Sequence, residues 1–321
     1  MIGAGQGGLS AAIEARLDGH DVTVFEARES VGGKAAPATV AGFRLDQGPS
    51  IVILPDLYRA TFSRAGKSMD DYLGFRKLPE ITRVVMEGQA PIDLPNDRAA
   101  CLDLVRSLDA SDADALEALL SKLDGTVAGV TETIFSKPFE RWTQLLDWRL
   151  IRFGLKFDVR KTYKDTIDGW FRHPLLRAFF YGFPSYGGQS YHAKAPGALT
   201  IPYFMLTDGV YWPVGPDGEG IAAIPAAYAR VEGIRNDSSR VTHVTVGGKD
   251  LPFDAVISNR DRFTAAAWTG ESESREPSYS YFTLHWGETV RRAGLKHHTL
   301  LIPENFAAGF DALYERREFP D

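Results

Sequence analysis

A glycine-rich turn at the start of the chain constrains the fold more than any other feature. Gly3, Gly5 and Gly8 have the spacing G-x-G-x-x-G, and helix-forming residues follow from Leu9 to Leu17. The first glycine of such a turn makes the tight bend, the second lets the backbone approach a pyrophosphate, and the third lets the helix pack closely on the sheet. The amide end of the helix then points at the phosphates. The turn therefore predicts a dinucleotide site.

The residues after this helix favour the same interpretation. The β-branched segment 21–25 predicts a short strand that ends at Glu26, about 20 residues beyond Gly3, where an acidic group takes a ribose hydroxyl. A carboxylate there would repel a 2′-phosphate, which disfavours NADP. A buried first strand needs about five residues, yet only Met1 and Ile2 precede the turn. We therefore expect the sequence given to begin inside its first strand.

Two further turns follow. The segment Glu26-Ala27-Arg28 leads to Gly32-Gly33-Lys34, in which paired glycines beside a basic residue let backbone amides and a cation reach a phosphate. The segment 43–50 then ends in Gly48-Pro49-Ser50 and supplies a second tight turn.

This order of motifs resembles the flavoprotein superfamily of amine oxidases, protoporphyrinogen oxidase, Rab escort-type proteins and carotenoid desaturases. In that superfamily the R-x-x-G-G segment lies along FAD, and the D-x-G-P/A-S segment approaches the isoalloxazine. The resemblance implies that FAD is the cofactor. The predicted cofactor-binding residues are Gly3, Gly5, Gln6, Gly7, Gly8, Glu26, Ala27, Arg28, Gly32, Gly33, Lys34, Gly48, Pro49 and Ser50.

Later segments narrow the resemblance to bacterial-type phytoene desaturases and the carotenoid desaturase family. It extends over nearly the whole chain. The segments that carry it are 208–215 (DGVYWPVG), 221–228 (IAAIPAAY), 255–261 (AVISNRD), 279–287 (YSYFTLHWG) and 296–300 (KHHTL).

The sequence departs from the family pattern in four places. Three residues separate Arg28 from Gly32, and the segment 216–220 interrupts a pair of glycines that are adjacent in the family. About a dozen or more residues are missing between segments that abut near Ala229. No C-terminal glycine-rich segment, which in the family grips FAD, precedes Asp321. We therefore expect the sequence given to be incomplete at this end as well.

The motifs, the resemblance they carry and the periodicity together predict the fold class: an α/β protein with a Rossmann-like FAD-binding domain and an inserted α+β substrate domain. Apolar residues recur at helical spacing in 102–108, 113–123 and 175–180, and two strand-like runs flank Gly247-Gly248. We expect a discontinuous FAD-binding domain at 1–85 and 209–270. The remaining residues, 86–208 and 271–321, are predicted to form the substrate and membrane-contact domain.

Charge and cysteine content limit the partners. The formal net charge of −6 gives no support for nucleic-acid binding, and the single cysteine, Cys101, fits a reducing, cytoplasmic compartment. No stretch approaches the roughly 20 apolar residues of a membrane span. Segment 137–157, however, holds five basic and five aromatic residues, which suit either an interfacial helix or a core helix with a solvated cationic face. The long hydrocarbon substrate implied by the resemblance favours the first, a protein peripheral at the membrane lipid surface.

The resemblance implies desaturation of a hydrophobic polyene such as phytoene, with a quinone or oxygen as electron acceptor. Asp208, His192 and Tyr191 are polar candidates for the base, which the sequence does not identify. No metal is expected, because adjacent His297 and His298 in a strand would point to opposite faces. Alternatives on the same scaffold are a carotenoid isomerase, a ketolase or a retinoid saturase. From another class, a Rab escort-like carrier would bind a prenylated partner without catalysis.

Overall fold

The computed structural model describes residues 1–136, 141–216, 218–229, 242–246, 248–269, 283–285, 287–290, 292 and 294–319. They fall into two compact units. The first holds Met1–Lys77 with the described residues from Tyr211 to 269 and 284–289. The second holds Leu78–Val210 and the described residues from 290 onward.

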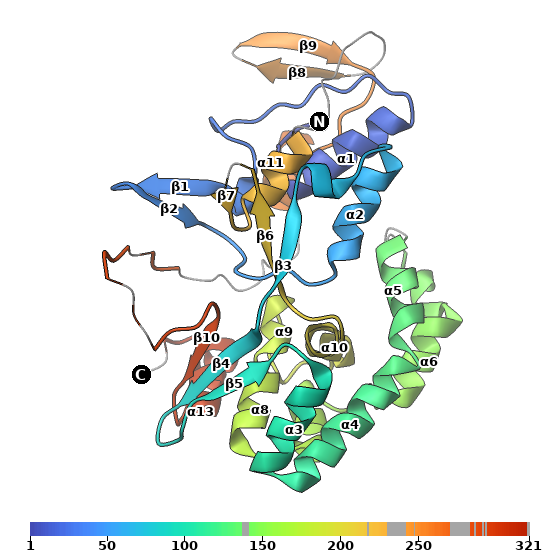
Figure 1. Ribbon diagram of the computed structural model, residues 1–321. Coiled ribbons are helices and arrows are strands. Elements are labelled where there is room, and N and C mark those ends of the chain that lie inside the picture. The colour runs from blue at the N-terminus through green and yellow to red at the C-terminus, as the bar shows by residue number, and fades with distance from the viewer. Residues whose placement is uncertain are drawn as a thin grey trace. The chain divides into compact units, whose positions relative to one another are not determined.

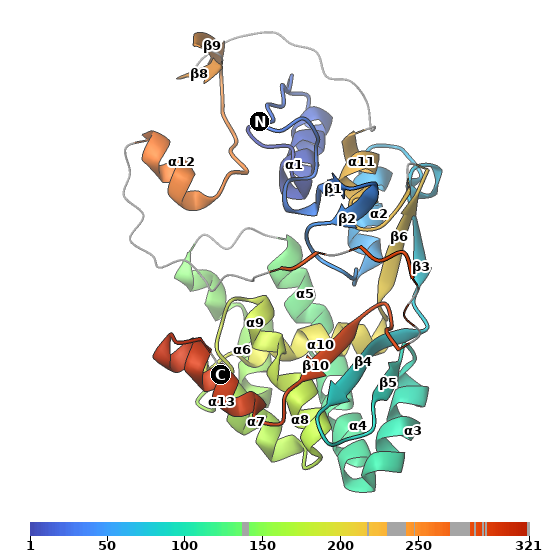
Figure 2. The same ribbon diagram turned by 90° about the vertical axis from the view of Figure 1, so that its left-hand side faces the viewer.

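The first unit contains a short parallel β-α-β arrangement. Helix α1 (Gln6–Leu17) connects Ile2 to Phe25, and Ile2 bridges in parallel to Phe25 on one side and to Ser258 on the other. Parallel pairing requires a crossover of this kind. The other elements of the unit are η1 (Gly33–Ala35), β1 (Pro37–Val40), β2 (Phe43–Asp46), α2 (Pro55–Arg64), η2 (Met69–Asp71), β3 (Gly74–Lys77), β6 (Tyr211–Gly215), β7 (Gly218–Glu219), α11 (Ala223–Ala229), β8 (Thr242–Val246), β9 (Lys249–Phe253) and α12 (Arg262–Thr269) (Figure 1 and Figure 2).

The core of the first unit fixes α1. Leu9 of α1 is buried in one cluster with Phe62 of α2 and with Ile224 and Tyr228 of α11. The rings of Phe62 and Tyr228 meet edge to face with centroids 5.1 Å apart. Because this packing holds the helix from two sides, the turn that precedes α1 is held in a fixed position.

The second unit combines a small sheet with many helices. Strand β4 (Glu80–Met86) pairs in parallel with β10 (Thr299–Ile302) and antiparallel with β5 (Ile92–Pro95). The helices are α3 (Arg98–Leu108), α4 (Ala110–Asp124), α5 (Val127–Ser136), η3 (Trp142–Leu146), α6 (Trp148–Lys156), α7 (Tyr163–Trp170), α8 (Pro174–Tyr181), α9 (Phe183–Tyr186), η4 (Pro196–Leu199), α10 (Thr200–Thr207), α13 (Phe306–Asp311) and η5 (Ala312–Arg316).

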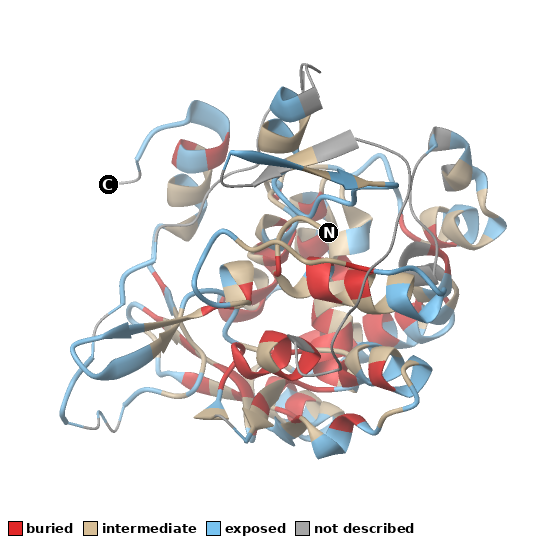
Figure 3. Cartoon of the chain, turned by 90° about the horizontal axis from the view of Figure 1, so that it is seen from above, coloured by how far each residue is buried: buried red, intermediate tan, exposed pale blue. Residues whose placement is uncertain are grey.

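Polar side chains set where these helices begin. Asp97 and Asp109 accept amides of the first turns of α3 and α4, which satisfies donors that a helix leaves free. Asp112 of α4 is buried and accepts the amides of Arg172 and His173, at 2.8 and 2.7 Å, just before α8. Many of the helices carry both buried and exposed residues, as their periodicity requires (Figure 3).

Most elements predicted from periodicity are confirmed. The helices expected at 102–108, 113–123 and 175–180 lie within α3, α4 and α8, and the hairpin around Gly248 is β8 and β9. The strand predicted at 21–25 is reduced to a single bridge at Phe25, because its neighbour contributes only Ile2 to the pairing. Among the segments that carry the family resemblance, 279–282 and Trp286 lie outside the described residues.

Candidate functional site

The glycine turn leaves the amides of α1 open to a ligand. The helix is capped by Gly5, which has no side chain to accept those amides, so the first-turn N–H groups point out of the helix end. A Cβ on Gly8 would lie 2.0 Å from the carbonyl oxygen of Gly3, so only glycine lets the helix pack this closely on the turn. A Cβ on Gly5 would meet nothing nearer than 3.4 Å within the protein. Gly8 is thus required by the fold, whereas Gly5 keeps space clear outside it.

The side chain of Glu26, which follows the strand-like segment 21–25, binds the backbone of the glycine turn. Its carboxylate accepts the amide of Ala4 at 2.8 Å and the amide of Arg28 at 3.0 Å. Burial alone would raise the pKa of Glu26, but the backbone amides of Ala4, Arg28 and Ala27 outweigh it and hold the pKa below its ordinary value. The group therefore stays ionised at neutral pH. A carboxylate has about four acceptor positions, so it retains capacity for ribose hydroxyls.

The second glycine pair lies against the first turn. The amide of Gly32 donates to the carbonyl of Ala4 at 2.8 Å, and Gly32 and Gly5 form a parallel bridge. A Cβ on Gly33 would lie only 3.1 Å from Gly5 Cα. Two segments separated by most of the β-α-β arrangement thus meet backbone to backbone, with the exposed side chains of Arg28 and Lys34 beside them.

The third motif, Gly48-Pro49-Ser50, lies against the second motif, Gly32-Gly33-Lys34. A Cβ on Gly48 would lie 2.3 Å from the carbonyl oxygen of Lys34, so these two backbones are in contact. Pro49 and Ser50 are exposed beyond it. Asp46 accepts a hydrogen bond from the backbone amide of Ile221 at 2.8 Å, just before α11. This bond links segment 43–50 to the later family-like segment 221–228.

Two buried acceptors near these segments indicate where a ligand would bind. Within the described part of the chain, Oε1 of Gln6 and Oδ1 of Asp46 are buried and accept no hydrogen bond. Gln6 stands inside the glycine turn, at the start of α1. Buried polar atoms normally have partners, so each of these acceptors suits a ligand donor. The free amides, the ionised Glu26 and the glycine contacts fit the ADP portion of FAD.

Asn259 is a residue of this site that the sequence motifs did not single out. Its backbone amide donates to the carbonyl of Ile2 at 2.8 Å, and this bond continues the parallel pairing between Ser258 and Ile2. Its side chain lies over the glycine turn, because a Cβ on Gly7 would come within 2.9 Å of Asn259 Nδ2. The sequence signals at this position were the strand-like run 255–258 that precedes Asn259 and the family-like segment 255–261 that contains it.

The three candidate bases lie in the second unit, where two of them share one carboxylate. Tyr191 donates to Asp311 Oδ1 at 2.7 Å, and His192 Nε2 lies 2.9 Å from the same oxygen. Burial and the bond to Asp311 raise the pKa of Tyr191, so its hydroxyl stays protonated at neutral pH and acts as a donor rather than a base. Asp208 lies at the C-terminal end of α10, apart from this pair in sequence. The base remains unidentified.

The structure corrects the interpretation of segment 137–157. Phe153 and Phe157 are buried, at 6% and 3% exposure, and pack on each other with ring centroids 4.9 Å apart, so neither can face lipid. The exposed apolar side chains of this region are instead Leu146, Trp148, Ile151, Leu155 and Val159. Residues 137–140 and the Trp142 side chain lie outside the described part of the chain.

The described residues contain neither a cluster of metal ligands nor a membrane-spanning helix. No three histidine, cysteine, aspartate or glutamate side chains among them gather as metal ligands. None of the helices in the described part of the chain has both the length and the apolar character to cross a bilayer.

Comparison with known proteins agrees with this site. Residues 1–64 match the family described as an NAD(P)-binding Rossmann-like domain. The whole chain aligns at 29% identity with 69% of 4,4'-diapolycopene oxygenase from Methylomonas sp, and at 26% identity with 69% of carotenoid 3,4-desaturase from Haloarcula japonica. An oxidoreductase structure from Methanosarcina mazei matches with TM-score 0.50 and 18% identity over 83% of this chain and 59% of that one, which supports the fold alone.

The fold and the site define a Rossmann-type oxidoreductase whose cofactor is FAD. The matched domain description names NAD(P), and the motif residues are those predicted to hold the ADP portion that NAD and FAD share. Within that class, the chain is a relative of carotenoid desaturases and oxygenases, as its motifs predict.

Proposed function

We propose that this protein uses FAD to desaturate a linear carotenoid precursor such as phytoene. The observation that carries the proposal is the convergence of the glycine turn, Glu26 and the Gly32-Gly33 pair at the open end of α1. Alignment of the whole chain with 69% of each of two carotenoid-modifying relatives supports the class of substrate. An intact dinucleotide site also argues against a Rab escort-like carrier, which would bind a prenylated partner without catalysis.

The chemistry follows from the cofactor. When bound, FAD would supply hydride acceptance from an allylic carbon, with the neighbouring proton passing to a base or water and the two electrons passing on to a quinone or oxygen. The residues described here would bind and orient the dinucleotide. The amides of α1 and the side chain of Gln6 would hold the pyrophosphate, and Glu26 would hold the ribose.

Incubation of the protein, loaded with FAD, with phytoene in liposomes tests this function. Desaturation should appear as a stepwise red shift of polyene absorption with a loss of two mass units per new double bond. The Gly5→Val variant is the inactive control. Transfer of oxygen to a terminal carbon would instead favour oxygenation, the activity named for the Methylomonas relative. Isomerisation, ketolation and retinoid saturation would each give products of a different mass or spectrum.

We further propose that the protein is peripheral at a membrane, with α6 as its contact. Trp148, Ile151 and Leu155 follow helical spacing, so they lie on one face, and they are 62%, 45% and 83% exposed. Basic residues flank this face, as they do on interfacial helices. A polyene substrate would reside in the lipid beside it.

Vesicle flotation tests the membrane contact. The triple variant Trp148→Ser, Ile151→Ser, Leu155→Ser should lose vesicle binding even in high salt, because it removes apolar burial rather than charge. Leu301→Ser on β10 is the matched control, since Leu301 is 73% exposed in the same unit. Equal flotation of the triple variant and the parent would remove α6 from the interface.

A further inference from the structure

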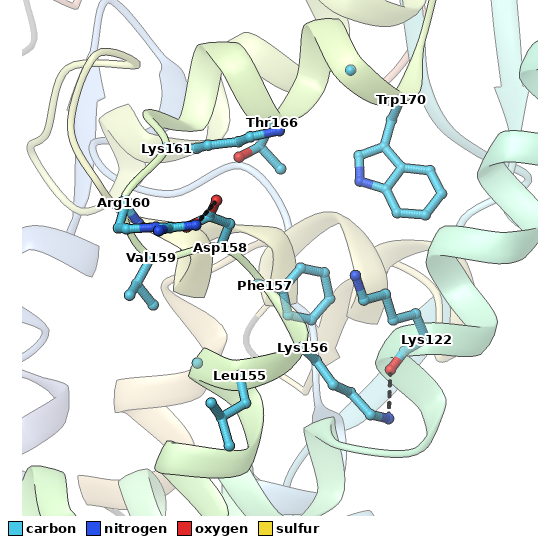
Figure 4. Close-up of a pocket in the computed structure, with 12 residues that line it drawn as sticks. Lys122, Leu155, Lys156, Phe157, Asp158, Val159, Arg160, Lys161, Thr166 and Trp170 are labelled. Carbon is cyan, nitrogen blue, oxygen red and sulfur yellow. Dashed lines mark hydrogen bonds and ion pairs between the residues drawn. The ribbon is translucent and has the colours of Figure 1, made fainter.

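A pocket of about 520 Å³ opens beside α6, on the second unit. Its walls come from three segments: Lys122 of α4, residues 154–161 at the end of α6 and the loop beyond, and Thr166, Gly169 and Trp170 of α7. Figure 4 shows the side chain of Lys161 running beside Thr166, and that of Lys122 lying between Phe157 and Trp170.

The pocket carries an excess of positive charge. Lys122, Lys156, Arg160 and Lys161 line it, and Asp158 is the acidic residue among the lining residues. Arg160 holds that carboxylate with two hydrogen bonds of 2.9 and 3.1 Å, which lower the pKa of Asp158 to about 2. Asp158 is therefore ionised but already engaged, and the described residues offer no carboxylate within 4.0 Å of the three lysine ammonium groups.

Lys122 is held in place by contacts that leave its charge unneutralised. Its ammonium lies 4.7 Å from the ring centroid of Phe157 and 5.7 Å from that of Trp170. The Lys156 ammonium points away from the Lys122 ammonium and donates to the backbone carbonyl of Lys122 at 3.3 Å. Among the described lining residues, Lys122 and Lys161 are thus the two cations not engaged by a carboxylate or a carbonyl, and the Thr166 side chain lies beside Lys161.

Two exposed apolar side chains also line the pocket and connect it to the α6 face. Leu155 and Val159 are 83% and 50% exposed. Leu155 also belongs to the face formed by Trp148 and Ile151. A ligand that uses both kinds of lining residue carries an anionic group and a hydrocarbon portion.

We propose that this pocket binds the phosphate group of an anionic phospholipid through Lys122 and Lys161. Ammonium groups and a hydroxyl suit phosphate oxygens, and Leu155 and Val159 would cover the first carbons of the lipid. The inference extends the membrane contact proposed for α6 and is independent of FAD and of the polyene. A free phosphate ester shares the head-group chemistry but would make no use of the apolar end.

Titration calorimetry with dihexanoylphosphatidylglycerol, kept as monomers, and with glycerol 3-phosphate tests the assignment without a membrane. Lys161→Gln should weaken binding of the short-chain lipid about fivefold, because each cation near an anionic head group contributes about that factor to the affinity. The double variant Lys122→Gln, Lys161→Gln should weaken binding about twentyfold or more. Arg152→Gln is the matched control, because Arg152 is an exposed cation of α6 that does not line the pocket. Lys161 is exposed, so its variant should keep the parent Tm even if Lys122→Gln does not.

The proposal is supported if the parent binds the lipid more tightly than glycerol 3-phosphate. Lipid affinity should also fall in Lys161→Gln and be kept in Arg152→Gln. Equal affinity for the two compounds would overturn the lipid assignment in favour of a soluble phosphate ester. Equal losses in Lys161→Gln and Arg152→Gln would overturn the pocket, because attraction would then be a general property of the basic surface. Short-chain lipid binding combined with failure of vesicle flotation would reject the α6 membrane contact and leave the pocket standing.

Discussion

Replacing Glu26 with glutamine should weaken both FAD binding and the fold of the first unit. The carboxylate gives one oxygen to the amide of Ala4 and the other to the amide of Arg28. Glutamine keeps one acceptor oxygen and turns an NH₂ group toward the second amide, so one of these N–H groups loses its partner. The same change removes the charge expected to hold the ribose hydroxyls.

The magnitude follows from the bonds that are lost. A hydrogen bond to a charged group contributes about 1.5–3 kcal/mol, and the partial exposure of Glu26 places the stability loss near the lower end. A loss of about 1.5 kcal/mol would lower the Tm by about 3–6 °C in a domain of this size. A similar loss toward the ribose weakens FAD about tenfold or more.

Two measurements on the purified protein separate these effects. Flavin fluorescence during titration of the apoprotein gives the Kd for FAD, and circular dichroism of the apoprotein gives the Tm. Glu29→Gln is the matched control, because it makes the same change of charge three residues away at an exposed position. That variant should keep the parent Kd within about twofold.

The reasoning would be refuted by an unchanged Kd for FAD in Glu26→Gln. A fall in Tm with the same affinity would mean that Glu26 only closes the glycine turn, and the ribose would then need another partner.

The remaining predictions concern pH, the glycines and one buried amide. The pKa of Glu26 in the folded protein lies below its ordinary value of 4.5. The ionised carboxylate therefore contributes its full stabilisation of the fold above about pH 4.5, and this contribution is lost as the pH falls through the folded-state pKa. On acidification, the Tm of the parent should drop more steeply than the Tm of Glu26→Gln. Gly5→Val should abolish FAD binding in a folded protein, whereas Gly8→Ala should unfold the first unit; stoichiometric flavin in Gly5→Val would contradict this. Asn96→Ala should cost about 2–3 kcal/mol in urea unfolding, because buried Asn96 donates to Leu78 and Val210 and accepts from Val210 at 2.7, 2.8 and 3.0 Å; a loss below about 0.5 kcal/mol would show that the unit relaxes.

Local pattern accounts for what was predicted correctly from the sequence. The spacing of Gly3, Gly5 and Gly8 specifies a turn and the start of a helix, since both depend on neighbouring residues alone. Helical periodicity likewise predicts α3, α4 and α8, and the glycine pair at 247–248 predicts the hairpin. The predicted roles of the cofactor-binding residues remain predictions, although the structure brings Gly5, Gly32 and Gly33 together.

Tertiary contacts decided the rest. No short-range pattern could indicate that Asn259 covers the glycine turn or that Asp46 binds the amide before α11, because those partners are more than 170 residues apart. In α6 the basic residues Arg149, Arg152 and Lys156 gather on one side and apolar residues fill a broad arc of the remainder, so periodicity alone could not choose which part of that arc is buried. The chain that packs against the helix makes that choice: Phe153 and Phe157 turn inward, and Trp148 and Leu155 remain outside. The sequence by itself predicted the kind of cofactor site, and only the packed structure determined which side chains lie beside the glycine turn and which apolar side chains of α6 remain exposed.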